Sequence, residues 1–153
     1  MAIRILNKQG DIAEVVRSTE PFMLEIEYEL EKQIKGLRVG IYLLTTQGEY
    51  IFTSFDTDDA RLYESQTVRE AGRYISRCEI PANLLNEGRY VVGVNASTYM
   101  IKRYFQDDQA LLFNVDPAGA PGMQWIETRL GPIRPALSWQ IENFENGDKK
   151  HGK

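Results

Sequence analysis

A chain of 153 residues with a formal net charge of −4 has the size of one domain and no excess of basic side chains. This balance argues against binding to nucleic acid or to an anionic lipid surface, because both need a positively charged footprint. The sequence has no apolar run near the roughly 20 residues that span a bilayer, no signal-peptide core, and a single cysteine, which cannot form an internal disulfide. We therefore expect a single-domain cytoplasmic protein without direct membrane insertion.

The first half of the chain shows the two-residue period of β-strands. Residues 1–7 predict a short strand that continues beyond a turn into residues 12–17. Residues 22–31 have apolar side chains at the even positions and mainly glutamates at the odd positions, which predicts one buried and one solvated face. Residues 37–46 and 50–55 predict two further strands joined by a glycine-containing hairpin turn.

The middle of the chain contains the hairpin around which we expect the fold to be built. Residues 73–80 and 89–96 alternate strictly on either side of a proline- and glycine-containing connection, which is typical of strands buried on one face. Before this hairpin, residues 56–72 have no sustained period and predict a long loop or a short helix. After it, residues 98–109 predict a loop rich in aromatic and basic side chains, followed by a strand at 110–115.

The carboxyl-terminal part begins with a proline- and glycine-rich bend, after which residues 125–130 and 131–141 predict closing strands. We expect Trp139 to be a core residue, because a lone tryptophan in a sandwich strand is usually buried, whereas Trp125 fits either the core or an exposed sugar platform. Many short strands without a periodic helix indicate an all-β protein, an immunoglobulin-like β-sandwich. We expect one domain over residues 1–141 and a polar tail over 142–153.

Catalytic and metal-binding patterns are weak. The only histidine, His151, lies in the tail, which argues against histidine-dependent nucleophilic catalysis and histidine-bound zinc. Cys78 lies in a predicted strand and is expected to pack as a small apolar residue. A carboxylate pair for glycoside hydrolysis, or a calcium site at residues 56–59, stays open in principle, although solvated loop acids are the simpler interpretation. The acids concerned are Asp56, Asp58, Asp59, Glu64, Asp107 and Asp108. We predict no enzyme activity, no metal and no cofactor.

A candidate ligand site emerges from the outward positions of three strands. In a sandwich of this kind the strands at 37–46, 89–96 and 110–115 are neighbours in one sheet. Their outward positions are Arg38, Gly40, Tyr42, Val91, Gly93, Asn95, Leu112 and Asn114. Aromatic and amide side chains beside glycines suit a sugar. The aromatic side chain stacks on the sugar ring, the amides form hydrogen bonds with the sugar hydroxyls, and the glycines let the ligand come close to the backbone. The predicted carbohydrate-binding residues are Tyr42, Gly93, Asn95 and Asn114 on the face, with Tyr99, Arg103 and Tyr104 at its rim. The alternative is that this face packs against a second protomer or against the segment 56–72.

Four segments together resemble the carboxyl-terminal domain of Wzt-type proteins, the ATP-binding subunits of ABC transporters that export lipid-linked polysaccharides such as O-antigen. The segments are IFTSFDTD (51–58), GRYISRCEIPANLLNEGRYVVGV (72–94), ALLFNV (110–115) and RLGPIRPALSWQI (129–141). The resemblance extends from Ile3 to Ile141. Neither the central hairpin nor the closing segment is specific alone, but their combination is.

This resemblance implies an immunoglobulin-like sandwich that binds the exported glycan on the cytoplasmic side, as a homodimer, together with the nucleotide-binding and membrane subunits of an ABC transporter. It also implies a preceding nucleotide-binding domain, which this sequence lacks. The chain is therefore either an excised domain or a free-standing relative, and we expect no ATP binding or hydrolysis.

The leading hypothesis is a non-catalytic carbohydrate-binding module that recognises a lipid-linked polysaccharide for export. The alternative is a protein-interaction or dimerisation module of the same fold without a sugar site. Because the connection before residue 131 is rich in proline and glycine, the segment 131–141 can pair with its own sheet or with that of a neighbour. We expect a homodimer with this segment near the interface.

Overall fold

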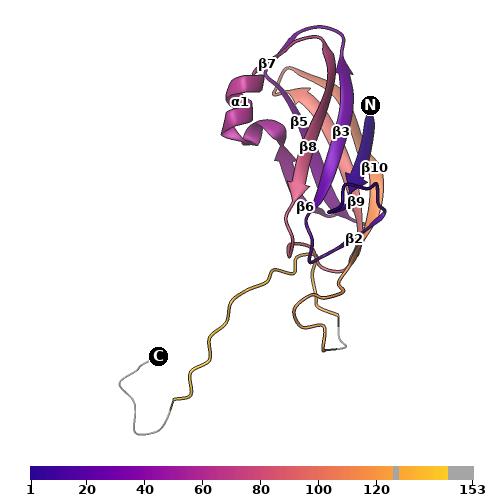
Figure 1. Cartoon of the computed structure of the whole chain (residues 1–153). Helices are drawn as coiled ribbons and strands as arrows, with labels where there is room; N and C mark the ends of the chain where they lie inside the picture. Colours follow the sequence, from indigo (N-terminus) through magenta and orange to yellow (C-terminus); the bar gives the residue numbers. More distant parts are fainter. Residues whose placement is uncertain (126–127, 145–153) are drawn as a thin grey trace.

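The computed structural model describes residues 1–125 and 128–144, and in them two main sheets pack face to face with a short helix at the side (Figure 1). The three-stranded sheet, in the order β1-β3-β8, contains β1 (Ala2–Leu6), β3 (Phe22–Leu30) and β8 (Gly72–Ile80). The five-stranded sheet, in the order β2-β10-β9-β5-β6, contains β2 (Val15–Arg17), β10 (Lys102–Asp116), β9 (Gly88–Thr98), β5 (Leu37–Thr45) and β6 (Tyr50–Phe55). The predicted all-β sandwich is confirmed.

The core lies between the two sheets and consists of the alternating apolar positions read from the sequence. Strands β3, β5 and β9 each bury every second side chain, and Val92 and Val94 have no exposed surface. The rings of Phe22 and Phe113 connect the two sheets, with centroids 5.4 Å apart. Since strand side chains point alternately to opposite faces, this burial aims the intervening residues of β5 and β9 at the outer surface.

The amino-terminal segment divides into two strands that belong to different sheets. In β1, Ile5 lies opposite Leu24 of β3, whereas in β2 Val16 lies opposite Val115 and runs parallel to the end of β10. Ile5 and Val16 are both buried, so one short segment contributes to both halves of the core. The predicted continuation beyond a turn therefore exists, but the turn moves the chain from one sheet to the other.

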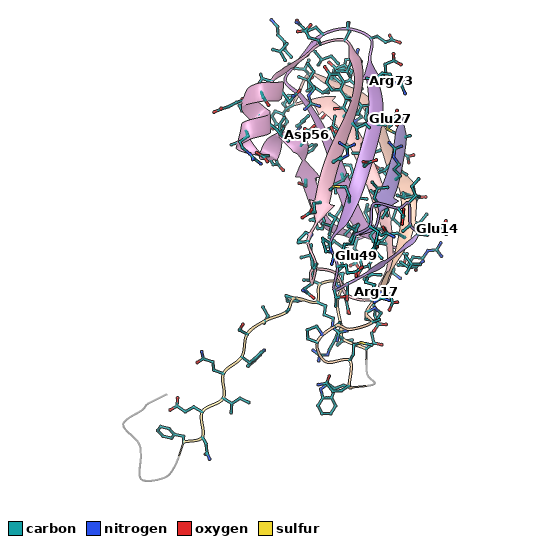
Figure 2. All side chains as sticks on the ribbon, in the orientation of Figure 1. Glu14, Arg17, Glu27, Glu49, Asp56 and Arg73 are labelled. Atoms are coloured by element: carbon teal, nitrogen blue, oxygen red, sulfur yellow. The ribbon has the colours of Figure 1, made fainter. Side chains whose placement is uncertain are left out.

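The outer face of the three-stranded sheet carries a row of ion pairs. Glu25 accepts hydrogen bonds from Arg4 at 2.8 Å and from Arg77 at 2.6 Å, while Glu27 accepts them from Arg4 at 3.0 Å and Arg73 at 2.9 Å. Glu27 and Arg73 lie on neighbouring strands near one end of the sheet (Figure 2). The prediction of a solvated glutamate face is wrong at Glu25, which is buried beneath these guanidinium groups.

These ion pairs make stability depend on pH. Hydrogen bonds from Arg77 and then Arg4 hold the pKa of Glu25 below its usual value of 4.5. A carboxylate whose pKa is lowered by folding adds stability above its unfolded-state pKa and loses it as the pH falls through the folded-state pKa. We expect the difference in free energy of unfolding between wild type and Glu25→Gln to be largest above the ordinary glutamate pKa of 4.5 and to shrink as the pH falls below it.

Urea unfolding at a series of pH values measures this difference. Glu29→Gln, which changes an exposed glutamate of the same strand, serves as the matched control. A Glu25→Gln difference that stays constant from neutral to acid pH would contradict the expectation.

The segment between β6 and β8 was predicted to be a long loop or a short helix, and it is helical. It contains a 3₁₀ turn (Asp56–Asp58), helix α1 (Ala60–Gln66) and β7 (Val68–Arg69), which pairs with β4 (Ile34–Lys35). The carboxylate of Asp59 caps the helix by accepting a 3.0 Å hydrogen bond from the backbone N–H of Arg61. This segment lies beside one edge of the sandwich (Figure 1).

A buried polar network fastens this segment to both sheets. Arg69, with a side chain 2% exposed, pairs with Asp56 at 2.9 Å and donates to the hydroxyl of Tyr28 at 2.7 Å. The other oxygen of Asp56 accepts the backbone N–H of Val39 at 3.1 Å, and Ser76 Oγ donates to the paired oxygen at 3.2 Å. Because these groups come from β3, β5, β7 and β8, the network joins the two sheets at their open edge.

Three predictions in the second half of the chain are wrong. Residues 98–109 are not a loop, because β9 and β10 form one long hairpin whose three-residue turn, Tyr99–Ile101, places Met100 at a φ of 61°. Residues 128–144 form no strand, apart from a single bridge between Ile133 and Leu85. Trp139 is 84% exposed and is not a core residue of this chain. Residues 126–127, and residues 145–153 with His151, lie outside the described range.

The carboxyl-terminal arm, residues 131–144, is held at its root and then leaves the body of the protein (Figure 1). The carbonyl of Pro132 accepts hydrogen bonds from the backbone N–H of Asn86 at 2.8 Å and from the hydroxyl of Tyr90 at 3.0 Å. The side-chain amide of Asn86 donates to the carbonyls of Arg129 and Gly131 at 2.7 Å each. The direction in which the arm leaves is therefore fixed by buried groups of the sandwich.

Candidate functional site

The outer face of the five-stranded sheet is hollowed where the β9–β10 hairpin turn stands above it. This hollow, the outer cleft, has a volume of about 350 Å³ and is formed by β5, the end of β6, β9, and the turn with the start of β10. It is lined by Arg38, Tyr42, Phe55, Asn95, Ser97, Thr98, Tyr99, Met100, Ile101, Lys102, Arg103 and Gln106. Most of these face outward because their strand neighbours fill the core.

Two glycines make room for the aromatic rings of the outer cleft. A Cβ on Gly40 would come within 2.4 Å of the ring of Phe55, and a Cβ on Gly93 within 3.1 Å of the ring of Tyr42. Any larger residue would push these rings off the sheet. The glycines were predicted to let a ligand approach the backbone, but the close approach at these positions is made by the chain's own aromatic side chains.

Arg38 lies between two of the aromatic rings. Its guanidinium carbon is 4.0 Å from the ring centroid of Phe55 and 5.1 Å from that of Tyr99 in the hairpin turn. Both distances are in the range of cation–π attraction. This stack links β6, β5 and the turn, and so sets one wall of the outer cleft.

A chain of polar side chains forms the opposite wall. The amide nitrogen of Asn95 donates to Gln106 Oε1 at 3.1 Å, and Gln106 Nε2 donates to Asp108 Oδ1 at 2.7 Å. Asn95 is only 5% exposed, so its orientation is fixed by packing as well as by this bond. Amide groups held in this way can present donors and acceptors to a ligand without large loss of side-chain entropy.

The structure brings together four of the seven residues predicted to bind carbohydrate: Tyr42, Asn95, Tyr99 and Arg103 all line the outer cleft. Gly93 lies beneath Tyr42 and the backbone of Asp108, as part of the floor.

The other two lie apart. Asn114 is on the same face but opposite Arg89, six positions along β9 from Asn95, or roughly 20 Å away at about 3.3 Å per residue. Tyr104 sits at a β-bulge, packs toward the core, and accepts a 3.4 Å hydrogen bond from Thr98.

Eight of the twelve residues that line the outer cleft were absent from the prediction, and three of them form its walls. Arg38 was placed on the outer face but not in the site, Phe55 lies in a strand whose register was ambiguous, and Gln106 lies in the segment expected to be a loop. The alternation of β10 around its bulge would have placed Gln106 outward, opposite Asn95, had the hairpin been recognised.

The family model of the Wzt C-terminal domain matches residues 1–126 of the chain. The chain belongs to the Wzt C-terminal domain family. The resemblance predicted from the sequence is thereby confirmed. The matched range covers both sheets and every residue of the outer cleft.

Comparison with solved structures gives the same fold for this Wzt C-terminal domain, with 14 matching chains. One of them, described as the crystal structure of the C-terminal domain of wzt, superposes with a TM-score of 0.69 over 92% of this chain and 81% of that chain, at 13% sequence identity. At this identity the likeness shows the fold alone. No curated protein matches the chain. Within residues 1–125 and 128–144, no helix has the length and apolar content needed to cross a membrane.

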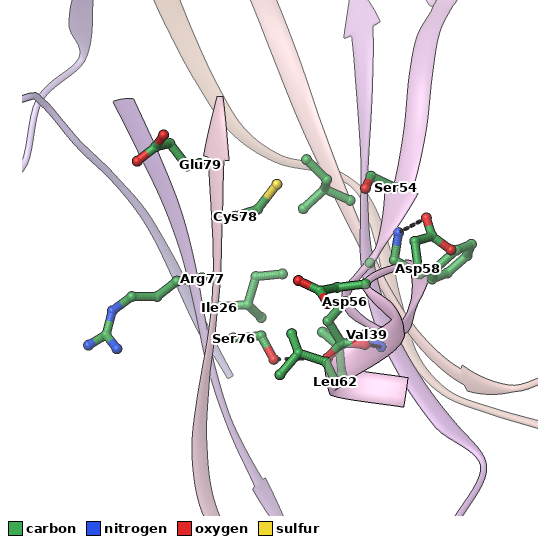
Figure 3. A pocket seen from close by; sticks show the side chains of 14 residues that line it. Ile26, Val39, Ser54, Asp56, Asp58, Leu62, Ser76, Arg77, Cys78 and Glu79 are labelled. Atoms are coloured by element: carbon green, nitrogen blue, oxygen red, sulfur yellow. Dashed lines mark hydrogen bonds between the residues drawn. The ribbon is translucent and has the colours of Figure 1, made fainter. Parts of the chain in front are cut away.

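A second hollow of the Wzt C-terminal domain opens between the edges of the two sheets and has a volume of about 250 Å³ (Figure 3). Ser76 and Cys78 of β8 point into this edge cleft, while Arg77 and Glu79 point away from it. Its floor is apolar, with Ile26 and Val39 among its residues. Burial raises the pKa of the Cys78 thiol, which suits the predicted role as a small apolar side chain and not that of a nucleophile.

The acids considered for catalysis or calcium binding mostly have partners within the domain. Asp56 belongs to the buried network, Asp58 accepts the backbone N–H of Phe55 at 3.0 Å, and Asp59 pairs with Arg61. Asp107 accepts the backbone N–H of Gln109, and Asp108 accepts from Gln106. In the part of the chain that the structure describes, no group of three or more His, Cys, Asp or Glu side chains is placed to hold a metal ion. The glycosidase and calcium alternatives therefore gain no support.

Proposed function

We propose that this Wzt C-terminal domain is a non-catalytic carbohydrate-binding module that recognises a lipid-linked polysaccharide, of the O-antigen type, for export by an ABC transporter. Membership of the family supports a role in such a transporter, and the module would act on its cytoplasmic side. The observation that carries the proposal is the outer cleft, where the exposed ring of Tyr99 and the half-buried ring of Tyr42 lie beside the amides of Asn95 and Gln106.

The chemistry of the outer cleft matches what a sugar requires. Apolar C–H faces of a sugar ring stack on aromatic side chains, and the hydroxyl groups accept and donate neutral hydrogen bonds worth roughly 0.5–1.5 kcal/mol each. Tyr42 rests on Gly93 and meets the ring of Tyr50 edge-on at 5.7 Å, so it is held in place before a ligand arrives. Rigid aromatic and amide groups of this kind lose little conformational entropy on binding.

The test is a calorimetric titration with the polysaccharide of the source organism, released from its lipid. We expect Tyr42→Ala and Asn95→Ala each to weaken binding about tenfold or more, which corresponds to about 1.4 kcal/mol. Asn114→Ala is the matched control, because Asn114 lies on the same face but far from the outer cleft, and it should bind as wild type does.

Thermal unfolding must accompany this titration, because Tyr42 covers Gly93 and Asn95 bonds Gln106, so both variants lose some internal contacts. The proposal would be overturned if both folded variants bound normally. If Trp139→Phe abolished binding at the same time, the sugar site would lie on the arm.

We also infer that the domain is a homodimer joined through its carboxyl-terminal arm. Leu137, Trp139 and Ile141 are 69%, 84% and 97% exposed, a degree of apolar exposure that one chain in water does not favour. A second copy of the domain is the occupant that best explains this exposure, because a segment that leaves its own sandwich can complete that of a neighbour. This dimer is compatible with a sugar site at the outer cleft, which the arm does not line.

A further inference from the structure

The outer cleft is positively charged although the protein as a whole is acidic. The chain has a formal net charge of −4, yet Arg38, Lys102 and Arg103 all line the cleft, and none of the described residues that line it is acidic. The carboxylate connected to it through hydrogen bonds is that of Asp108, which is already engaged by Gln106. A local excess of cations in a concave site raises the affinity for a ligand of negative charge.

The position of Arg38 identifies which cation would contact the ligand most directly. Its guanidinium is held between the rings of Phe55 and Tyr99, and its Nε is buried without a hydrogen-bond partner among the described residues. By contrast, Arg4, Arg69, Arg73 and Arg77 each have a carboxylate partner within the chain. Arg38 has no such carboxylate partner among the described residues, so its positive charge is left for a ligand of opposite sign.

We propose that the ligand of the outer cleft is an acidic glycan, whose carboxylate or phosphate group binds Arg38 with support from Arg103 and Lys102. The planar guanidinium presents its N–H groups as a fork that matches the two oxygens of a carboxylate or phosphate, which a neutral hydroxyl group cannot do. The neighbouring aromatic rings fix the plane of this fork. The inference rests on the proposed carbohydrate-binding function and adds to it the chemical class of the sugar, a uronic acid or a phosphorylated residue.

A purely structural role for Arg38 is the competing explanation. In that case the stack of Phe55, Arg38 and Tyr99 only holds the hairpin turn in place, and substitutions would change stability while leaving the charge of the ligand unimportant. The two explanations differ in their dependence on ligand charge and salt, which a structural role does not affect.

The experiment compares three forms of the lipid-free polysaccharide from the source organism: untreated, carboxyl-reduced, and dephosphorylated with cold aqueous hydrogen fluoride. We expect the untreated form to bind wild-type protein, with an affinity that falls at least about tenfold between about 50 mM and 500 mM NaCl. One of the two treatments should weaken binding by at least about tenfold. Loss on carboxyl reduction identifies a carboxylate, and loss on dephosphorylation identifies a phosphate.

Variants of the protein provide the second arm of the experiment. Arg38→Gln should weaken binding of the untreated polysaccharide at least about tenfold, and Arg38→Lys should fall between this variant and wild type, because it keeps the charge but not the fork. Arg89→Gln, which removes an exposed arginine from the far end of the same sheet face, is the matched control and should bind normally. If Arg38→Gln does not fold, Arg103→Gln, which changes an exposed residue of the same cleft, replaces it.

The outcomes separate this inference from the proposed function. The inference is overturned if wild-type protein binds both treated polysaccharides, and Arg38→Gln binds the untreated one, as tightly as wild-type protein binds the untreated one. If Tyr42→Ala fails to bind in the same experiment, the ligand is a neutral sugar and the carbohydrate site stands. If wild-type protein binds none of the three forms, the proposed function fails and the inference fails with it.

Discussion

Arg69→Met is expected to lower the free energy of unfolding by about 3–5 kcal/mol, the usual cost of removing one partner of a buried ion pair. The side chain of Arg69 is 2% exposed, and it connects Asp56, the hydroxyl of Tyr28 and the carbonyl of Leu37. Without the guanidinium, the carboxylate of Asp56 keeps its bonds to Val39 and Ser76 but loses its ion-pair partner at a place where its side chain is only 14% exposed. Chemical denaturation of wild type and variant measures the difference.

The double variant Asp56→Asn/Arg69→Met distinguishes the charge effect from lost packing. Because it leaves no unpaired buried charge, it should recover part of the stability lost in the single variant. The matched control is Arg61→Met, which removes a surface arginine with a side chain 90% exposed from the Asp59 pair, and it should leave the free energy of unfolding nearly unchanged because water screens an exposed ion pair. A loss below about 1 kcal/mol for Arg69→Met would show that the network does not hold the two sheets together.

The alternation of side chains was enough to predict most of the sandwich. In β3, β5 and β9 the apolar side chains recur at every second position, so both the strands and their buried faces follow from the sequence. The ion pairs of Glu25 did not follow, because Arg4 and Arg77 are 21 and 52 residues away and meet this glutamate only through strand pairing. A glutamate that reads as solvated in one strand is buried by arginines from its two neighbours.

The β9–β10 hairpin shows why a strand can be mistaken for a loop. Its turn contains no glycine, asparagine or proline, and Met100 takes the left-handed conformation that such residues usually provide. The ladder is then interrupted by register shifts between Arg103 and Phe105 and between Asp107 and Leu111, which break the two-residue period. A strand with two bulges gives no clear alternation in the sequence.

The same effects decide how far the candidate site could be predicted. Tyr42 and Asn95 lie in regular strands, so their outward direction was predictable, and they line the outer cleft. Asn114 was predicted to be outward, and it is exposed, but its distance from the cleft depends on the bulges that shift β10 along β9. Tyr104 turns inward at the first of these bulges. The direction of a side chain follows from the alternation along its strand, whereas its distance from the cleft depends on how that strand is paired with its neighbour.

The carboxyl-terminal arm leads to the prediction with the largest effect on assembly. Its apolar side chains Ile133, Leu137, Trp139 and Ile141 occupy odd positions, and the even positions carry Arg134, Ala136, Ser138 and Gln140. In an extended chain this alternation places the apolar groups on one face. Burial of each large apolar side chain contributes about 1.5–3 kcal/mol, so a second sandwich that covers this face gains substantial stability. Pro135 cannot donate a hydrogen bond to a sheet, which suits an edge strand.

We therefore expect the chain to sediment as a homodimer at micromolar concentration and Trp139→Ser/Ile141→Ser to sediment as a monomer. Ser138→Ala/Gln140→Ala is the matched control, because it changes the opposite face of the same segment and should remain dimeric. In a Trp125→Phe background, the fluorescence of Trp139 should shift to shorter wavelength as the protein concentration rises, since dimerisation would bury a ring that is 84% exposed in one chain.

The outcomes also test where the arm acts. The root of the arm is anchored by Asn86 and Tyr90 in its own sandwich, so exchange between copies must begin beyond Arg134. A monomer with unshifted Trp139 fluorescence at micromolar concentration would contradict the dimer. A dimer that persists in Trp139→Ser/Ile141→Ser would place the interface elsewhere, and loss of polysaccharide binding by Tyr42→Ala in that dimer would still assign the sugar to the outer cleft.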